Sequence, residues 1–178
     1  MAIDAERGSA ALQAGQVIDG FRLDERAHQG GMAHLWYVSR VDAEPGALPL
    51  VMKVPRLKGG SDPTTIVGFE VEQMIVPTLG GPHVPKFIAK GDATRQPYIV
   101  MERIAGTSLK PRFDAAPIPI AEVVEVGCKV ANALHELHRQ HVVHLDVKPS
   151  NIMFRTNADG SRGLAVLIDY GLSRHDQL

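Results

Sequence analysis

The spacing of hydrophobic residues divides the chain into a strand-rich part and a helix-rich part. The first part holds short apolar runs with β-type alternation, at residues 21–23, 35–38 and 49–54. A glycine pair at 30–31 and a connection at 40–48 separate these runs. Apolar runs of this length between turn-forming residues indicate β-strands, and the 40–48 connection indicates a hairpin. This part is therefore predicted to form a sheet.

A helical spacing follows the strand-rich part. The residues that recur at this spacing are Ile66, Phe69, Gln73, Val76 and Leu79. They predict a helix over residues 63–79, which Pro77 and the Gly-Gly-Pro sequence at 80–82 bring to an end. Two further strands are expected at 84–89 and 98–101, on either side of a turn-rich segment.

The clearest helix is predicted over residues 121–140. One face is apolar and consists of Val123, Val124, Gly127, Val130, Ala131, Leu134 and Leu137. Short strands are expected at 152–154 and 164–168 beyond it. Strands, a helix, strands, a long helix and a final strand pair predict a two-layer α+β arrangement rather than alternating βαβ units.

Composition narrows the classes of function. The chain has 178 residues, 44% of them hydrophobic, and its net charge is −1 from 19 basic and 20 acidic residues. No basic tract suggests a nucleic-acid partner, and no apolar run is long enough to be a membrane segment. Cys128 is the single cysteine, so a disulfide framework is excluded, and we expect it to be buried. The N-terminus lacks the plan of a signal peptide, which favours a cytoplasmic protein.

The segment 144–151 carries the strongest chemical signal. It places Asp146, Lys148 and Asn151 on one tight loop, and Asp169 begins an Asp-Tyr-Gly sequence 18 residues after Asn151. Phosphoryl transfer needs a group that accepts or orients a hydroxyl, a cation for the transferring phosphate, and oxygen ligands for a metal. The residue types in these two segments meet those needs.

The two segments resemble the H-R-D-x-K-x-x-N and D-F-G motifs of eukaryotic-type (Hanks-type) bacterial serine/threonine protein kinases. The resemblance implies an α+β, protein-kinase-like fold. It has a complete small lobe, with a five-stranded antiparallel sheet and one helix, and the first part of a helical large lobe. We expect a flexible tail at 1–18, the small lobe at 19–104 and the partial large lobe at 105–178.

The resemblance also implies roles for individual residues. Asp146 accepts the proton of the substrate hydroxyl or orients that hydroxyl, and Lys148 offsets charge on the γ-phosphate. Asn151 and Asp169 hold Mg²⁺, with Mn²⁺ as an alternative ion. His144 is expected to be structural and to pack beneath the site with Tyr170.

Lys53 is the candidate for binding the nucleotide phosphates. It shares a strand face with apolar Val51, and an inward-facing lysine needs an anionic partner. Its sequence resembles the V-A-I-K motif, whose lysine holds the α- and β-phosphates. Glu70 and Glu72 are both candidate partners. Glu72 lies three residues after Phe69 and seven before Leu79, which resembles the family's F-x-x-E…L spacing, so the resemblance favours Glu72 and leaves Glu70 at the surface.

The remaining nucleotide site is implied by resemblance. The glycine pair could be only a hairpin turn, but it resembles the kinase glycine-rich loop. Met101 is expected at the back of the adenine pocket, with the Glu102 carbonyl and the Ile104 amide on the adenine edge. The full implied set is Gly30, Gly31, Leu35, Val51, Lys53, Glu72, Met101, Glu102, Ile104 and Met153.

Two departures from the family pattern lead to expectations of their own. Leu145 replaces the arginine of H-R-D, so the non-RD loop cannot pair with a phosphate on the activation segment, and activity is expected not to require one. The sequence stops seven residues after Gly171, whereas a complete kinase continues through an A-P-E motif. We expect an exposed apolar face on the 121–140 helix, and self-association through it.

The sequence therefore favours an ATP- and Mg²⁺-dependent kinase that phosphorylates Ser/Thr hydroxyls of a protein substrate. A pseudokinase or nucleotide-binding regulatory module is the first alternative, since the glycine-rich loop and residue 145 are altered. A small-molecule kinase of the aminoglycoside or choline type is the second, because such enzymes share the H-x-D…N arrangement.

Overall fold

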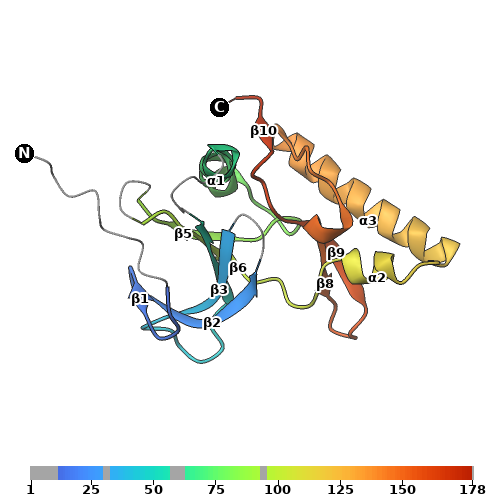
Figure 1. The fold of residues 1–178 in the computed structure, drawn as a ribbon. Helices are drawn as coiled ribbons and strands as arrows, with labels where there is room; N and C mark the ends of the chain where they lie inside the picture. Colours follow the sequence, from blue (N-terminus) through green and yellow to red (C-terminus); the bar gives the residue numbers. More distant parts are fainter. Residues whose placement is uncertain (1–11, 30–32, 57–62, 93–95, 178) are drawn as a thin grey trace, which may run out of the picture.

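The computed structural model describes residues 12–29, 33–56, 63–92 and 96–177 of the chain. Two lobes lie side by side, one built on a curved sheet and the other on a long helix with two short strand pairs (Figure 1). The chain passes from the first lobe to the second after strand β6, Ile99–Glu102. The expected division into a sheet lobe and a helical lobe is present.

The small-lobe sheet has six strands in the described residues, in the order β1-β2-β3-β4-β6-β5, and all its pairs are antiparallel. Besides β6, the strands are β1 (Val17–Ile18), β2 (Phe21–Gln29), β3 (Ala33–Arg40), β4 (Leu50–Pro55) and β5 (Phe87–Lys90). Five strands were expected. The additional strand is β1, which lies in the segment predicted as tail and pairs Val17 with Arg22 of β2.

Strand β4 shows how the sheet separates its two faces. Leu50, Met52 and Val54 are buried in one hydrophobic cluster with Trp36 and Val38 of β3. Val51 and Lys53, which alternate with these residues, point to the other face and are half-buried. Because side chains alternate across a strand, the same apolar run that builds the small-lobe core also directs Lys53 toward the other side.

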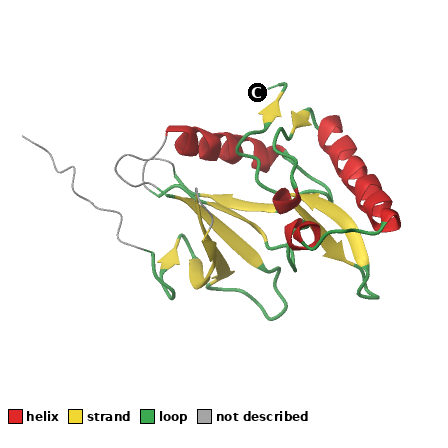
Figure 2. Cartoon of the chain, turned by 45° about the vertical axis from the view of Figure 1, so that its right-hand side comes forward, coloured by secondary structure: helices red, strands yellow, loops and turns green. Residues whose placement is uncertain are grey.

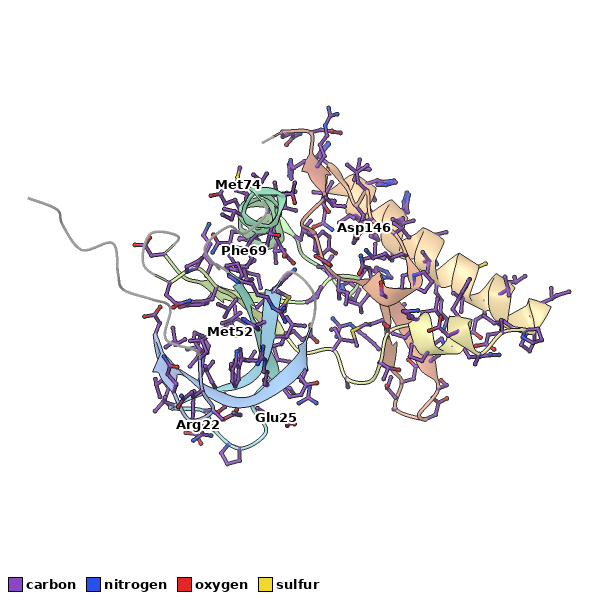
Figure 3. The ribbon with its side chains drawn as sticks, in the orientation of Figure 1. Arg22, Glu25, Met52, Phe69, Met74 and Asp146 are labelled. Carbon is purple, nitrogen blue, oxygen red and sulfur yellow. The ribbon has the colours of Figure 1, made fainter. Side chains whose placement is uncertain are left out.

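Helix α1, Pro63–Ile75, packs beside this sheet and continues into a 3₁₀ turn η1, Val76–Thr78. Phe69 is buried and points toward the sheet, whereas Met74 is exposed on the opposite side of the helix (Figure 3). Buried Gln73 donates its side-chain amide to the carbonyls of Gly91 and Tyr98, at 3.3 and 3.1 Å. The helix predicted over 63–79 is thus present, with its last turn tightened around Pro77.

The large lobe contains two helices and two strand pairs in the described residues (Figure 2). Its elements are α2 (Lys110–Asp114), α3 (Ile120–Arg139), β7 (Val142–Val143), η2 (Pro149–Asn151), β8 (Ile152–Thr156), β9 (Arg162–Leu167) and β10 (Arg174–His175). Strand β8 pairs with β9, and β7 pairs with β10. The sequence did not predict α2, β7 or β10.

A second hydrophobic cluster crosses the boundary between the lobes. From the small-lobe side it includes Ile75 and Val84, and from the large lobe Leu137, Leu167 and Tyr170. The segment that follows α1 is therefore fixed in the same core as α3 and β9. This shared core sets the position of α1 relative to the large lobe.

Helix α3 buries only part of the face that the sequence predicted. Leu137 is buried and Val130 and Leu134 pack against the shared core, but Val123 and Val124 are 53% and 58% exposed. The prediction for Cys128 was wrong, because it is exposed on this helix. Self-association through the exposed side stays a prediction. No helix within the described ranges is long and apolar enough to cross a membrane.

The two sides of α3 should differ in their contribution to stability. Leu137→Ala removes a buried side chain and leaves a cavity, so we expect a loss of about 2–5 kcal/mol in the free energy of unfolding. Val124→Ala, on the exposed side, should change it by less than about 0.5 kcal/mol. Urea unfolding at equilibrium measures both. Equal losses for the two variants would contradict the assignment of the faces.

Candidate active site

Lys53 lies between two carboxylates from separate parts of the chain. Its Nζ is 2.5 Å from Oε2 of Glu72 on α1 and 3.0 Å from Oδ1 of Asp169, which follows β9. The Lys53 side chain is 17% exposed and that of Glu72 only 2%. The predicted choice of Glu72 over Glu70 is confirmed, since Glu70 is exposed.

The charges at this junction depend on one another. Burial alone would lower the pKa of Lys53, but the negative charges of Glu72 and Asp169 outweigh it and raise that pKa above its usual value. For the Asp169 carboxyl, burial acts in the opposite direction and would raise the pKa. The charge of Lys53 outweighs burial and holds the pKa of Asp169 below its usual range. Burial does raise the pKa of Glu72, against the effect of Lys53. The lysine is therefore a firmly protonated cation.

Residues 144–151, here called the catalytic loop after the motif that they resemble, form a second polar cluster. Lys148 Nζ is 2.7 Å from Asp146 Oδ2, and the Asn151 amide donates to both the main-chain carbonyl and Oδ2 of Asp146, each at 2.9 Å. The η2 turn brings Asn151 back toward the loop through its N–H, which donates to the Lys148 carbonyl. Lys148 and Asn151 thus both bond the Asp146 carboxylate.

His144 joins the catalytic loop to the Asp-Tyr-Gly segment. The N–H of Asp146 donates to His144 Nδ1 at 3.3 Å, so the ring proton lies on Nε2, which donates to the Ile168 carbonyl at 3.1 Å. The ring also contacts Tyr170, with 5.0 Å between ring centroids. The predicted packing of His144 with Tyr170 is confirmed. Burial lowers the pKa of His144, which favours this neutral form.

Two residues next to these contacts have left-handed backbone. The φ angle is 61° at Leu145 and 68° at Asp169. This conformation costs a residue other than glycine roughly 1–2 kcal/mol. Leu145 lies directly before Asp146, and Ile168 directly before Asp169. The hydrogen bonds of His144 thus support the backbone at both unfavourable positions.

A close approach of two glycines places α1 against the Asp-Tyr-Gly segment. A Cβ on Gly68 would lie 3.2 Å from the Gly171 carbonyl oxygen, and one on Gly171 would lie 3.2 Å from the Gly68 carbonyl oxygen. In addition, the Tyr170 N–H points to Glu72 Oε1 at 3.5 Å. The lack of side chains at these two positions lets α1 come close enough for Glu72 to reach Lys53.

The residues expected around the adenine lie on neighbouring strands. Val51 of β4 is directly opposite Met101 of β6, and Leu35 of β3 is opposite Lys53. Ile104 is buried, and the other expected pocket residues are half-buried, namely Leu35, Val51, Met101, Glu102 and Met153. Gly30 and Gly31 lie outside the described residues. Leu35, Val51 and Met101 therefore lie on three adjacent strands of the small-lobe sheet.

The donor atoms at this junction suit a hard divalent cation. Mg²⁺ is typically held by one or two carboxylates together with substrate phosphates. Asn151 commits its amide nitrogen to Asp146, which leaves its side-chain oxygen for a metal. Asp169 uses Oδ1 for Lys53 and is 47% exposed, so Oδ2 can bind a metal. These residues fit Mg²⁺ brought in with a nucleotide.

Comparison with known proteins agrees with this geometry. A family model described as protein kinase domain matches residues 50–177, and the chain therefore belongs to this family. It is similar to the probable serine/threonine-protein kinase PknB of Lactococcus lactis, with 27% identity over 165 residues, 92% of this chain and 25% of that protein. It is also similar to PknL of Mycobacterium bovis, with 32% identity over 127 residues, 71% of this chain and 31% of that protein.

Solved structures show the same fold. The crystal structure of the Mycobacterium tuberculosis PknI kinase domain matches with a TM-score of 0.71 and 24% identity, over 90% of this chain and 63% of that chain. The chain thus has the small lobe of a protein kinase and the first part of the large lobe. It spans about a quarter of the length of PknB from Lactococcus lactis.

The sequence did not point to every residue that shapes this site. Gly68 was not singled out, because the need for glycine there is visible only once its close approach to Gly171 is known. Arg155 was also missed, although it reaches the small lobe from β8. No motif in the sequence marks either residue, since both act through contacts with distant segments.

The neutral His144 predicts a loss of stability in mild acid. Its folded pKa lies below the ordinary value of 6.5, so the unfolded chain takes up the proton first. The stability from the neutral ring is present above about pH 6.5 and is lost as the pH falls toward the folded pKa. Urea unfolding at pH 7.5 and 5.5 should show a smaller acid loss for His144→Gln than for the wild type. The exposed His138→Gln variant should keep the wild-type loss; equal losses in all three proteins would contradict this role.

The glycine contact predicts opposite effects of the same substitution on two helices. Gly127→Ala on α3 has nothing within 4 Å, so it should stabilise the fold by about 0.5–1 kcal/mol through helix propensity. Gly68→Ala should lose that gain or reverse it, because its methyl group would press on the Gly171 carbonyl. Urea unfolding compares the two. An equal gain for both variants would show that the approach of α1 tolerates a side chain.

Proposed function

We propose that this chain carries the nucleotide-binding and catalytic-loop part of an enzyme that transfers the γ-phosphate of ATP, with Mg²⁺, to Ser or Thr hydroxyls of protein substrates. The observation that carries the proposal is Lys53 held between Glu72 and Asp169. In this family that lysine binds the nucleotide phosphates and the Asp of the D-F-G motif binds the metal. The ion pair prepares both groups before a nucleotide arrives.

The residues of the catalytic loop then divide the remaining work. The Asp146 carboxylate accepts the proton of the attacking hydroxyl or orients that hydroxyl, and its contacts with Asn151 and Lys148 hold it in place. Lys148, which is half exposed, turns its charge to the transferring phosphate. Bound Mg²⁺ would neutralise charge on the phosphates through Asn151 and Asp169.

Support for a Ser/Thr acceptor comes from the named relatives and from Lys148. PknB of Lactococcus lactis and PknL of Mycobacterium bovis are both named serine/threonine-protein kinases. By family resemblance, a lysine at position 148 is typical of kinases with such acceptors. The proposal therefore names the class of substrate, a protein with a Ser or Thr hydroxyl.

Replacing the two aspartates should separate binding from transfer. Asp146→Asn removes the group that handles the hydroxyl proton, so phosphoryl transfer should fall by about 100-fold or more while Mg·ATP binding stays within about threefold. Asp169→Asn removes a metal ligand and should raise the Kd for Mg·ATP by about tenfold. Calorimetric titration measures binding, and labelled ATP with a basic protein acceptor measures transfer.

Asp159→Asn is the matched control, since Asp159 lies in an exposed turn and contacts Ser161. It should leave binding and transfer unchanged. Normal transfer by Asp146→Asn would overturn the assigned role of Asp146. If the wild-type protein binds nucleotide without transferring phosphate, the regulatory-module alternative is favoured. If it transfers phosphate only to small-molecule hydroxyls, the alternative of a small-molecule kinase is favoured.

A further inference from the structure

Arg155 reaches from the large lobe to the strand that leads out of the small lobe. From β8, its Nη1 is 2.5 Å from Glu102 Oε1 and its Nη2 is 3.0 Å from Glu102 Oε2. Its Nε donates to the Pro82 carbonyl at 2.8 Å, and Nη2 approaches the Val84 carbonyl at 3.5 Å. One planar guanidinium thus contacts both the end of β6 and the segment between α1 and β5.

The backbone around Arg155 is shaped for this reach. The β8–β9 register shifts between Phe154 and Thr156, where β9 has one residue more than β8, so Arg155 lies opposite a bulge in the hairpin. A Cβ on Gly163, across the hairpin, would lie 2.8 Å from the Arg155 carbonyl oxygen, which only glycine permits. A bulge bends the strand pair and increases its twist. The Arg155 side chain, opposite this bulge, crosses to the small lobe.

Glu102 is held from several directions at once. Its Oε2 also accepts the Lys86 N–H at 3.1 Å, and its own N–H donates to the Lys86 carbonyl at 2.8 Å. The side chain of Glu102 is 13% exposed and that of Arg155 is 30% exposed. The hydrogen bonds from Arg155, partly opposed by burial, hold the pKa of Glu102 below its usual range. The carboxylate is therefore ionised and fixed at neutral pH.

The other contacts of this segment are made by different large-lobe residues. Gln140 exchanges hydrogen bonds with the main chain of Gly80, and His83 Nδ1 contacts the Ala165 carbonyl at 2.8 Å. Those contacts hold residues 80–83. Within the described residues, the Arg155 guanidinium is the large-lobe group that bonds the Glu102 side chain, so it links the end of β6 to the large lobe.

We propose that Arg155 is a positioning residue for the nucleotide: it fixes the end of β6 against β8, and so sets the distance between the adenine edge contacts and the pocket floor. The inference rests on the proposed function, in which the Glu102 carbonyl and the Ile104 amide bind the adenine. Strand β8 also carries Met153, two residues before Arg155 and part of the same adenine pocket. Arg155 therefore ties two sides of that pocket together.

The matched control is a second bidentate arginine that stays within one lobe. Arg112 Nε and Nη2 bond the Glu122 carboxylate at 3.0 and 2.7 Å, joining α2 to α3. Arg155→Gln should raise the Kd for Mg·ATP by about five- to tenfold, because the edge contacts lose their fixed position. Arg112→Gln should leave it within about twofold of the wild type. Equal Kd values for the two variants would overturn the proposal.

The partner residue supplies an internal check. Glu102→Gln should weaken Mg·ATP binding by a similar factor, and the double variant with Arg155→Gln should be no weaker than either single variant. Arg155→Lys keeps the charge but cannot bond both carboxylate oxygens and two carbonyls, so an intermediate Kd is expected. Fully additive effects of Glu102→Gln and Arg155→Gln would show that the two residues act separately, against the proposal.

A measurement without nucleotide separates this inference from the proposed function. Amide hydrogen exchange by NMR should show the Lys86 N–H exchanging faster in Arg155→Gln than in the wild type or Arg112→Gln. Unchanged exchange at Lys86 would show that Arg155 does not fix the end of β6, whether or not ATP binds. Faster exchange with an unchanged Kd would overturn its role in nucleotide positioning. A wild-type chain that binds no Mg·ATP would overturn the proposed function, and the nucleotide role with it.

Discussion

The Lys53 ammonium is nearly removed from water, and the charge of a buried lysine is tolerated only beside compensating anions. Its two carboxylates come from α1 and from the segment after β9, so three distant pieces of chain must meet at one point. Two features of the structure place α1 where Glu72 can meet Lys53. The lack of side chains at Gly68 and Gly171 lets the two segments approach each other. The hydrophobic cluster that contains Ile75 and Leu137 anchors the C-terminal end of α1.

The position of this charge between the lobes explains why the lobes share a core. Two lobes with separate cores could move apart and take Asp169, which belongs to the large lobe, away from Lys53. Lys53 would then keep only Glu72, its partner within the small lobe. The shared hydrophobic cluster, which includes Val76 of η1 and Leu137 of α3, resists that separation. Arg155 and Glu102 resist it beside the strand where the chain crosses between lobes.

The sequence predicted what depends on local spacing. Lys53 followed from strand alternation, Glu72 from its spacing to Phe69 and Leu79 as in the family pattern, and the Asp146–Asn151 loop from its own residues. Strand β1 was missed because two residues carry too little periodicity, and Cys128 was misplaced because its burial depends on what covers α3. Arg155 could not be predicted, since its partners Pro82 and Glu102 are distant from it in the sequence.

His144 shows how the loop is ordered when residue 145 is not an arginine. The imidazole bonds the N–H that follows Leu145 and the carbonyl that precedes Asp169, so one neutral ring fixes both segments of the site. Leu145 itself is 61% exposed, and its backbone conformation is held by its neighbours rather than by its side chain. The geometry of Asp146 therefore comes from groups within the site. That activity does not require a phosphate on the activation segment stays a prediction from leucine at position 145.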